Sequence, residues 1–181
     1  YFFSSMKLLI IGDSFSHNNN GWPSMLGVDF KNCSENGVGE YKVLKQIHNA
    51  DSHDKILVNH TSPWRVHTPN HPVHKHSNDR QHNDFMLTDV EYHSKVNKQM
   101  KIVNQYLKKY YDPTYQLDIY NLIVDKLLSL KNAIHITFHD PEDTAKINNN
   151  YNELWKTHPG NINHMSPIGN EVVADKIKKL L

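Results

Sequence analysis

The sequence lacks three features that would each assign a chain to a class of protein: paired cysteines, a long apolar run and an excess of one charge. The single cysteine, Cys33, excludes a disulfide within the chain, which fits a reducing compartment. The longest early apolar run, residues 8–11, is too short for a transmembrane helix of about 20 residues and for the apolar part of a signal peptide. We therefore expect a cytoplasmic protein without a membrane partner.

Positive and negative charges are nearly balanced. The chain has 20 Lys and Arg against 19 Asp and Glu, a formal net charge of +1. A protein that binds nucleic acid usually carries a basic face, so we expect no nucleic-acid partner. Histidine is abundant instead, with 14 residues. These side chains would make the protein distinctly cationic below about pH 6.5.

The length of 181 residues fits one domain. A chain of this size buries roughly 70% of its unfolded surface, so a core can form without disulfides or metal. We expect residues 6–181 to form a single domain, with Met6 as the natural start and residues 1–5 as an upstream extension or expression remnant. Residues 63–88 are polar and rich in histidine, which predicts a loop insertion that could act as a lid.

Predicted strands alternate with predicted helices along the chain. The segments with the pattern of strands are 7–11, 28–33, 55–58 and 133–138. The segments with the pattern of helices are 22–26, 41–48, 88–111, 113–130 and 171–181. This alternation predicts a parallel sheet with helices on both faces, whose ligand crevice lies at the carboxyl ends of the strands. Residues 12–14, Gly39 and residues 59–62 fall at such ends.

The longest predicted helix is a single one over residues 88–111. Thr88 to Glu91 has the pattern of a capping box, which marks the start of a helix. Apolar residues then recur at a spacing of three or four, which predicts one buried face. They are Val96, Met100, Val103 and Leu107.

Two motifs at opposite ends of the chain carry the functional prediction. Residues 10–16 place Ser14 directly after a strand and a Gly-Asp turn. Alone, a Gly-Asp-Ser tripeptide is common and could simply cap a helix. Near the other end, the sequence Asn-x-x-His places His164 in a loop just before the last helix. From that loop His164 can return to the edge of the first strand.

These two motifs resemble those of the SGNH (GDSL-like) hydrolases, which have a Gly-Asp-Ser turn after the first strand and an Asp-x-x-His motif before the last helix. The resemblance spans residues 6–181. It implies a flavodoxin-like three-layer α/β/α sandwich with a central parallel sheet. It also implies that Ser14 is the nucleophile and that His164 is the general base that takes its proton.

The resemblance implies an oxyanion site as well. The family uses a glycine after the second strand and an asparagine after the third, beside the nucleophile. Here Gly39 fits the first role and Gly37 is the alternative, unless both glycines simply make a turn. For the second role, Asn59 could supply an amide or Thr61 a hydroxyl, depending on the register. We therefore take Ser14, Gly39, Asn59 and Thr61 as the candidate oxyanion residues.

The acid of the family's triad is replaced in this sequence. Asn161 stands three residues before His164, where the family has aspartate. An asparagine carbonyl can orient the imidazole but offers no negative charge to the imidazolium. Three explanations compete: a Ser-His dyad, an acid recruited from elsewhere such as Asp140, and a weakened enzyme. Our hypothesis is the dyad, with Asn161 as the third candidate catalytic residue.

Residues beside the predicted strand ends are candidates for substrate binding. Trp64 could contact a sugar ring, and Arg65 an anionic or carbonyl group. A packed tryptophan and a structural ion pair explain the two residues equally well. Asp13, next to the nucleophile, is the third candidate.

Several histidines lie close together in the predicted insertion. Imidazoles at such spacing could bind zinc or nickel. The segment offers no cysteine and no carboxylate at helical spacing, so we assign no metal ligand and expect no cofactor. The histidines in question are His67, His71, His74 and His76.

The sequence thus predicts a serine esterase that removes a small acyl group from a small-molecule or glycan ester. The preference for acetyl groups on carbohydrate is implied by the resemblance alone. One alternative is a catalytically weak binding module with the same fold, which the replacement at Asn161 favours. The other is a metal-binding protein that uses the histidine-rich loop.

Overall fold

The computed structural model describes residues 6–17, 20–49, 53–74, 82–160 and 164–181. Its centre is a sheet of five parallel strands in the order β2-β1-β3-β6-β7. The strands are β1 (Lys7–Ile11), β2 (Asp29–Asn32), β3 (Lys55–His60), β6 (Ala133–Thr137) and β7 (Asn149–Asn150). The predicted parallel sheet is confirmed. The sequence pattern missed β7, because a strand of two asparagines has no apolar alternation.

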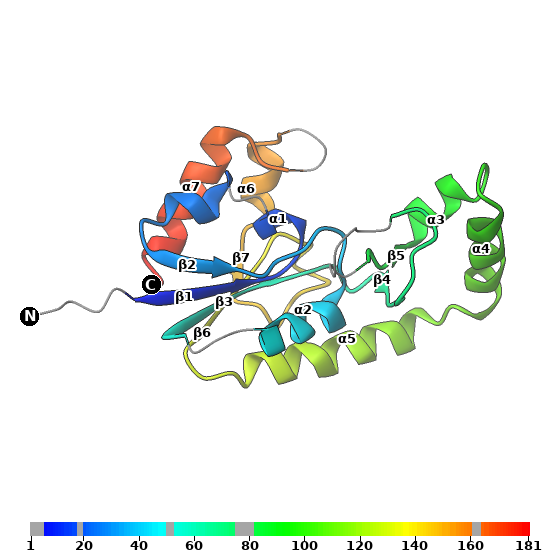
Figure 1. Cartoon of the computed structure of the whole chain (residues 1–181), viewed down its shortest axis with the longest axis horizontal. Helices are drawn as coiled ribbons and strands as arrows, with labels where there is room; N and C mark the ends of the chain where they lie inside the picture. Colours follow the sequence, from blue (N-terminus) through cyan, green and yellow to red (C-terminus); the bar gives the residue numbers. More distant parts are fainter. Residues whose placement is uncertain (1–5, 18–19, 50–52, 75–81, 161–163) are drawn as a thin grey trace, which may run out of the picture.

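The two faces of the sheet are covered by different helices. Leu8 and Ile10 of β1 point to the face that packs on η1 (Trp22–Met25), α6 (Asn152–Thr157) and α7 (Pro167–Lys178). Leu9 and Ile11 point to the other face, which packs on α2 (Glu40–Gln46) and α5 (Pro113–Leu128). Side chains of a strand alternate between the faces, so four consecutive residues of β1 supply both cores. Figure 1 shows the resulting three layers, as predicted.

None of the helices in the described ranges is both long enough and apolar enough to cross a membrane.

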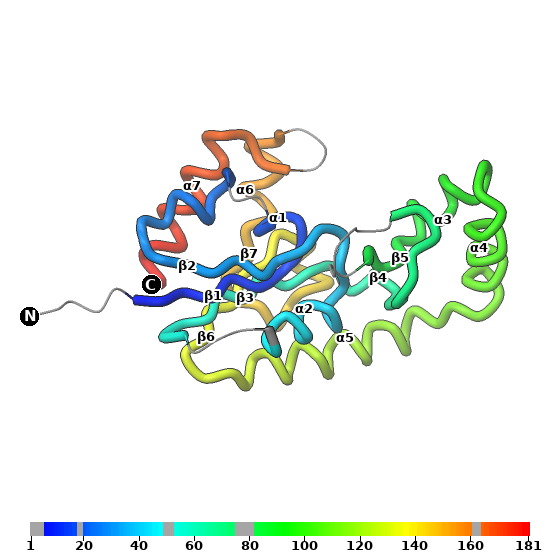
Figure 2. Tube along the Cα trace, in the orientation of Figure 1, coloured from blue at the N-terminus to red at the C-terminus, as the bar shows by residue number. Residues whose placement is uncertain are grey.

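A second, smaller unit, here called the arm, comprises residues 65–110 as far as they are described. It contains a two-stranded antiparallel sheet, β4 (Arg65–Val66) and β5 (Phe85–Met86), followed by α3 (Leu87–His93) and α4 (Lys98–Tyr110). The arm stands at the end of the molecule opposite the C-terminus (Figure 1). The chain enters it after β3 and returns to the sheet along α5 (Figure 2). The arm therefore includes most of the insertion that the sequence places at residues 63–88.

The single helix predicted over residues 88–111 is wrong. Helix α3 ends at His93 and α4 begins at Lys98, with the Asn97 side chain accepting a hydrogen bond of 3.0 Å from the Met100 N–H. Val96 lies in the connection and is 85% exposed. The N-cap residue of α3 is Met86, whose side chain makes no capping bond, so the predicted capping box is not formed. Met100 and Leu107 are buried, as their apolar spacing predicts. They pack against Val90 of α3, because the chain turns between the two helices.

A buried carboxylate helps to tie the arm to the core. Asp84 accepts hydrogen bonds from the N–H groups of Gly39 (2.7 Å) and Thr68 (2.8 Å). It also forms an ion pair of 2.8 Å with Lys42 of α2, and both side chains are at most 5% exposed. His67 Nδ1 lies 3.2 Å from the same carboxylate. Asp84 thus joins the arm to the start of α2.

We expect Asp84→Ala to lower the free energy of unfolding by about 3–5 kcal/mol, because it leaves the buried Lys42 ammonium without its counter-charge. Urea denaturation monitored by circular dichroism measures the change. The matched control is Asp118→Ala at an exposed position of α5, for which the expected change is within about 0.5 kcal/mol. A loss of similar size in both variants would contradict the role of this ion pair.

Candidate active site

The turn after β1 requires glycine. Gly12 has a φ of +155°, and a Cβ atom there would lie 2.7 Å from Asn59 Cβ and 2.8 Å from the Asn59 carbonyl oxygen. The side chain of Gln46 holds this turn from α2: its Oε1 accepts from the Gly12 N–H (2.7 Å), and its Nε2 donates to the Gly12 carbonyl (3.0 Å). The chain therefore leaves β1 in one defined direction. Ser14 follows at the first position of α1 (Ser14–His17).

Ser14 is half-buried and borders a pocket of about 230 Å³ between the core and the arm. Gly37 lines this pocket from the core, and Arg65 lines it from β4. The rest of the lining also comes from the arm: His74, Asn83, Asp84, Met86 and Asp89. Of the residues that the sequence places at the strand ends, Ser14 lines this pocket, whereas Gly39 and residues 59–62 do not. Arg65, a candidate for substrate binding, lines the same pocket.

Asp13 is fully buried beside Ser14. One carboxylate oxygen accepts hydrogen bonds from the Phe15 N–H (3.0 Å) and the Asn59 amide (2.9 Å). The other accepts from the Thr61 hydroxyl (3.1 Å) and lies 3.3 Å from His139 Nε2. These partners surround both carboxylate oxygens, and the fully buried Asp13 is inaccessible to substrate. Its assignment as a substrate-binding residue is therefore corrected.

Asp13 is held ionised in this environment. Burial opposes ionisation, but the hydrogen bond and charge of His139, the charge of Arg65 and the Phe15 N–H outweigh it and lower the pKa of Asp13. The carboxylate therefore places a negative charge directly behind Ser14 at neutral pH.

His164 reaches the same region from the loop before α7. Its ring stacks on Phe15, the residue after Ser14, with ring centroids 5.8 Å apart and an angle of 24° between the planes. Among the hydrogen bonds of the described residues, none joins Ser14 to His164. Asn161, the predicted replacement for the acid, lies outside the described residues. Asp140 is exposed, and its Oδ1 accepts from the Glu142 N–H in a local turn, which places its carboxylate in a structural role.

The sequence reasoning missed His139. It follows β6 by two residues, and its Nε2 lies 3.3 Å from the buried Asp13 carboxylate. The ring also meets Phe15 edge-on, with centroids 5.8 Å apart. His139 and His164 therefore both contact Phe15, and His139 is the one that pairs with a carboxylate. Its position at the carboxyl end of a predicted strand was the available signal.

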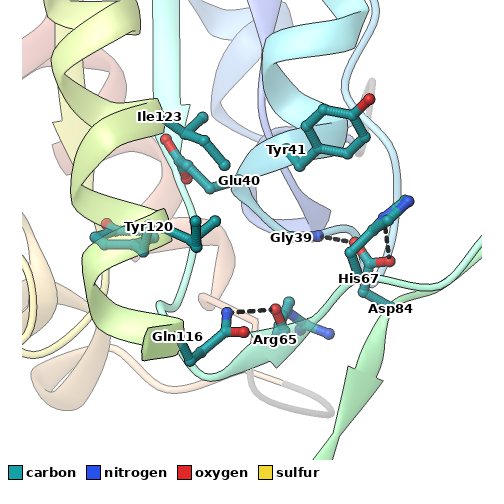
Figure 3. Close-up of a pocket in the computed structure, with 10 residues that line it drawn as sticks. Gly39, Glu40, Tyr41, Arg65, His67, Asp84, Gln116, Tyr120 and Ile123 are labelled. Atoms are coloured by element: carbon teal, nitrogen blue, oxygen red, sulfur yellow. Dashed lines mark hydrogen bonds and ion pairs between the residues drawn. The ribbon is translucent and has the colours of Figure 1, made fainter. Parts of the chain in front are cut away.

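The structure corrects the three oxyanion candidates beyond Ser14. The Gly39 N–H donates to Asp84, as the dashed line in Figure 3 shows. The Asn59 amide is fully buried and donates to Asp13 and to Ser16. The hydroxyl of Thr61 is also fully buried, within reach of Asp13 Oδ2 and the Val38 carbonyl. The Gly39 N–H thus binds the arm, and the Asn59 amide and the Thr61 hydroxyl hold Asp13 at the strand ends.

Gly37, the alternative to Gly39, does line the pocket of Ser14. It has a φ of +68°, and a Cβ atom there would lie 2.3 Å from the side-chain nitrogen of Asn83. The amide of Asn83 therefore packs directly on Gly37 at the wall of the pocket. Sequence reasoning passed over Asn83, because it is one of many asparagines in a polar segment without periodicity.

The two residues at the start of the arm have different surroundings. Trp64 donates from Nε1 to Asp143 (2.8 Å) and does not line the pocket of Ser14 among the described residues, which corrects its assignment to substrate binding. Arg65 does line it, and its Nη1 donates to the Gly37 carbonyl (3.1 Å). Its backbone carbonyl accepts from the Gln116 amide of α5 (3.0 Å; Figure 3). Arg65 is thus held by Gly37 at the pocket of Ser14 and by Gln116 at a neighbouring pocket, which Figure 3 shows.

A group of titratable side chains borders the pocket from the arm. His71, His74 and Asp89 each offer a potential metal-ligating atom, and these atoms lie within 4.8 Å of one another. Burial and the neighbouring His74 lower the pKa of His71 to about 4, so His71 is neutral at physiological pH. His76, the last residue of the predicted histidine group, lies outside the described residues.

Comparisons with known proteins identify the fold. No family model matches the sequence, and no curated protein matches it. Among solved structures, a protein from Bacteroides uniformis described as a GDSL-like lipase is 14% identical, with 100% of this chain and 97% of that chain covered and a TM-score of 0.51. A protein from Desulfitobacterium hafniense described as a lipolytic protein of the G-D-S-L family is 12% identical, with 97% and 99% covered and a TM-score of 0.44. The fold comparison rests on the first of these. The chain has the three-layer α/β/α fold of GDSL-like proteins, as the sequence motifs imply.

Proposed function

We propose that this protein is a serine hydrolase that cleaves esters of small acyl groups, with Ser14 as nucleophile and His164 as general base. The observation that carries the proposal is the position of Ser14. The Gly12 turn places it at the carboxyl edge of the sheet, where it opens onto the pocket between core and arm. This edge is where open α/β sheets bind their ligands.

In the proposed reaction, the imidazole of His164 takes the proton of the Ser14 hydroxyl while the oxygen attacks the ester carbonyl carbon. The tetrahedral intermediate collapses, and the alcohol leaves with the proton from the imidazolium. Water then hydrolyses the acyl-enzyme by the same route. Support for His164 comes from the stacking of its ring on Phe15, the residue that follows Ser14 in the chain. Catalytic hydrogen bonds often tighten only when substrate is bound.

The developing oxyanion needs donors that face the pocket. We propose the backbone N–H groups of Ser14 and Gly37 and the side-chain amide of Asn83 for this role. Support comes from the position of all three residues in the lining of one pocket and from the packing of Asn83 on Gly37. The buried Asn59 and Thr61 then have the separate task of holding Asp13.

The pocket also limits the substrate. A volume of about 230 Å³ lies below the usual range for drug-sized ligands, which favours a small acyl group such as acetyl. Its wall is polar, with the Arg65 guanidinium and the Asn83 amide, and Met86 is its apolar side chain on β5. This lining favours the ester of a polar alcohol. Acetyl esters of carbohydrate meet both conditions.

The first test is hydrolysis of p-nitrophenyl acetate by the intact protein and by Ser14→Ala. We expect the variant to lose at least about 10³-fold in kcat/KM, since no other group supplies the acyl acceptor. Ser129→Ala, at an exposed position after α5, is the matched control and should keep full activity. Activity that survives in Ser14→Ala would refute the proposal.

The second test separates the two histidines that contact Phe15. If His164 is the base, His164→Ala should lower kcat by about 10³-fold or more, whereas His139→Ala should change it by less than about 10-fold. The reverse pattern would identify His139 as the base with Asp13 as its carboxylate partner, and would overturn the assignment of His164.

The third test concerns the oxyanion. We expect Asn83→Ala to lower kcat by about 10²-fold with little change in KM, because the donor acts mainly on the transition state. Asn148→Ala, at an exposed position far from the pocket, is the control. An unchanged kcat in Asn83→Ala would remove Asn83 from the oxyanion site.

A further inference from the structure

Three imidazoles converge on one carboxylate in the arm. His74 Nε2 lies 3.3 Å from both oxygens of Asp89, and His93 Nε2 lies 3.3 Å from Oδ1. His71 Nε2 lies 3.5 Å from Oδ2. Hydrogen bonds between charged imidazole and carboxylate groups are usually about 2.7–2.9 Å long, so none of these contacts is a tight ion pair. The carboxylate is shared among the three rings instead.

The three rings do not have equal roles, because the hydrogen bonds of His71 determine its tautomer. His71 Nδ1 accepts from the backbone N–H groups of Val73 (3.2 Å) and His74 (3.0 Å). The neutral ring therefore carries its proton on Nε2 and directs it to Asp89. Nε2 is fully buried and has no closer partner in the described structure. Such a ring cannot offer a lone pair at Nε2, but it can orient the carboxylate.

His74 and His93 remain as rings that can present a lone pair at Nε2. Asp89 and His93 lie four residues apart on α3 and therefore on the same face of the helix. In a tetrahedral zinc site with bonds of about 2.0–2.1 Å, adjacent ligand atoms lie about 3.3 Å apart. Two of the three ligand separations, from Asp89 Oδ1 to His74 Nε2 and from Asp89 Oδ1 to His93 Nε2, match this spacing. The rings of His74 and His93 meet edge-on with centroids 5.1 Å apart, so these two rings must turn toward a common point when an ion binds.

We propose that the arm binds one zinc-like divalent cation through His74, His93 and Asp89, and that His71 is the outer partner that orients Asp89. Histidine nitrogen and carboxylate oxygen are ligands that zinc prefers, and ligating carboxylates are usually hydrogen-bonded from a second residue. The ion joins the loop that carries His74 to α3. Three protein ligands leave one coordination position to water or substrate. His74 and Asp89 also line the pocket of Ser14, so the ion borders the candidate active site.

The experiment titrates the metal-free full chain with Co²⁺, whose absorption bands report tetrahedral coordination, and then displaces it with Zn²⁺. We expect one equivalent to bind. His74→Gln, His93→Gln and Asp89→Asn should each weaken binding by at least about 100-fold, since each removes one of three ligands. His71→Gln should weaken binding by about 10–100-fold and keep the stoichiometry, as expected for an outer partner.

The control is His48→Gln, at an exposed histidine outside the cluster, which should bind as the intact protein does. With 14 histidines in the chain, adventitious binding is the main competing result. Binding that survives in all three ligand variants, or the absence of stoichiometric binding, would overturn the proposal. Circular dichroism of each variant shows that a loss of binding is not a loss of folding, and His93→Gln changes a helix-surface position that should fold normally.

The proposal is independent of hydrolysis. The titration needs no substrate, and Ser14→Ala should bind the cation as tightly as the intact protein. Failure of the metal site and failure of the esterase are therefore separate results.

Discussion

The carboxylate of Asp84 lies where the arm meets the core, and the candidate active site depends on the contacts it makes. It binds the Gly39 N–H at the start of α2, pairs with Lys42 and holds the Thr68 N–H of the arm. The pocket of Ser14 has one wall on the core and the other on the arm. The buried Asp84 carboxylate has hydrogen-bond and ion-pair partners on both the core and the arm, and these contacts hold the two units in a defined orientation. Such a group is costly to leave unpaired, which makes this arrangement specific.

A second buried carboxylate organises the floor of the site. Asp13 is surrounded by donors from β3, from α1 and from His139 after β6. These contacts join three parallel strands at their carboxyl ends and hold the turn that carries Ser14. In the Gly-Asp-Ser turn, the side chains of consecutive residues point in different directions. The aspartate is thus a structural and electrostatic support, and the serine is the group that faces the pocket.

The parts of the fold that follow from local patterns were predictable. Segments such as residues 7–11 have an apolar run that ends in a Gly-Asp turn, so both the strand and the placement of Ser14 at its end could be inferred. The break between α3 and α4 was not, because Val96 continues the apolar spacing although Asn97 caps a new helix. Periodicity alone does not distinguish one long helix from two helices that fold back on each other.

The sequence by itself determined the parallel α/β architecture, the turn with Ser14 and the resemblance of the two terminal motifs, since each depends on residues adjacent in the chain. Only the tertiary structure decided which polar groups face the pocket. Asn59 and Thr61 donate to the buried Asp13, whereas Asn83 and Arg65 line the pocket of Ser14 from the arm. The pairing of Asp13 with His139 joins residues 126 positions apart. Donors and acceptors pair because they lie close together in space, and the spacing of residues along the chain does not predict such pairs.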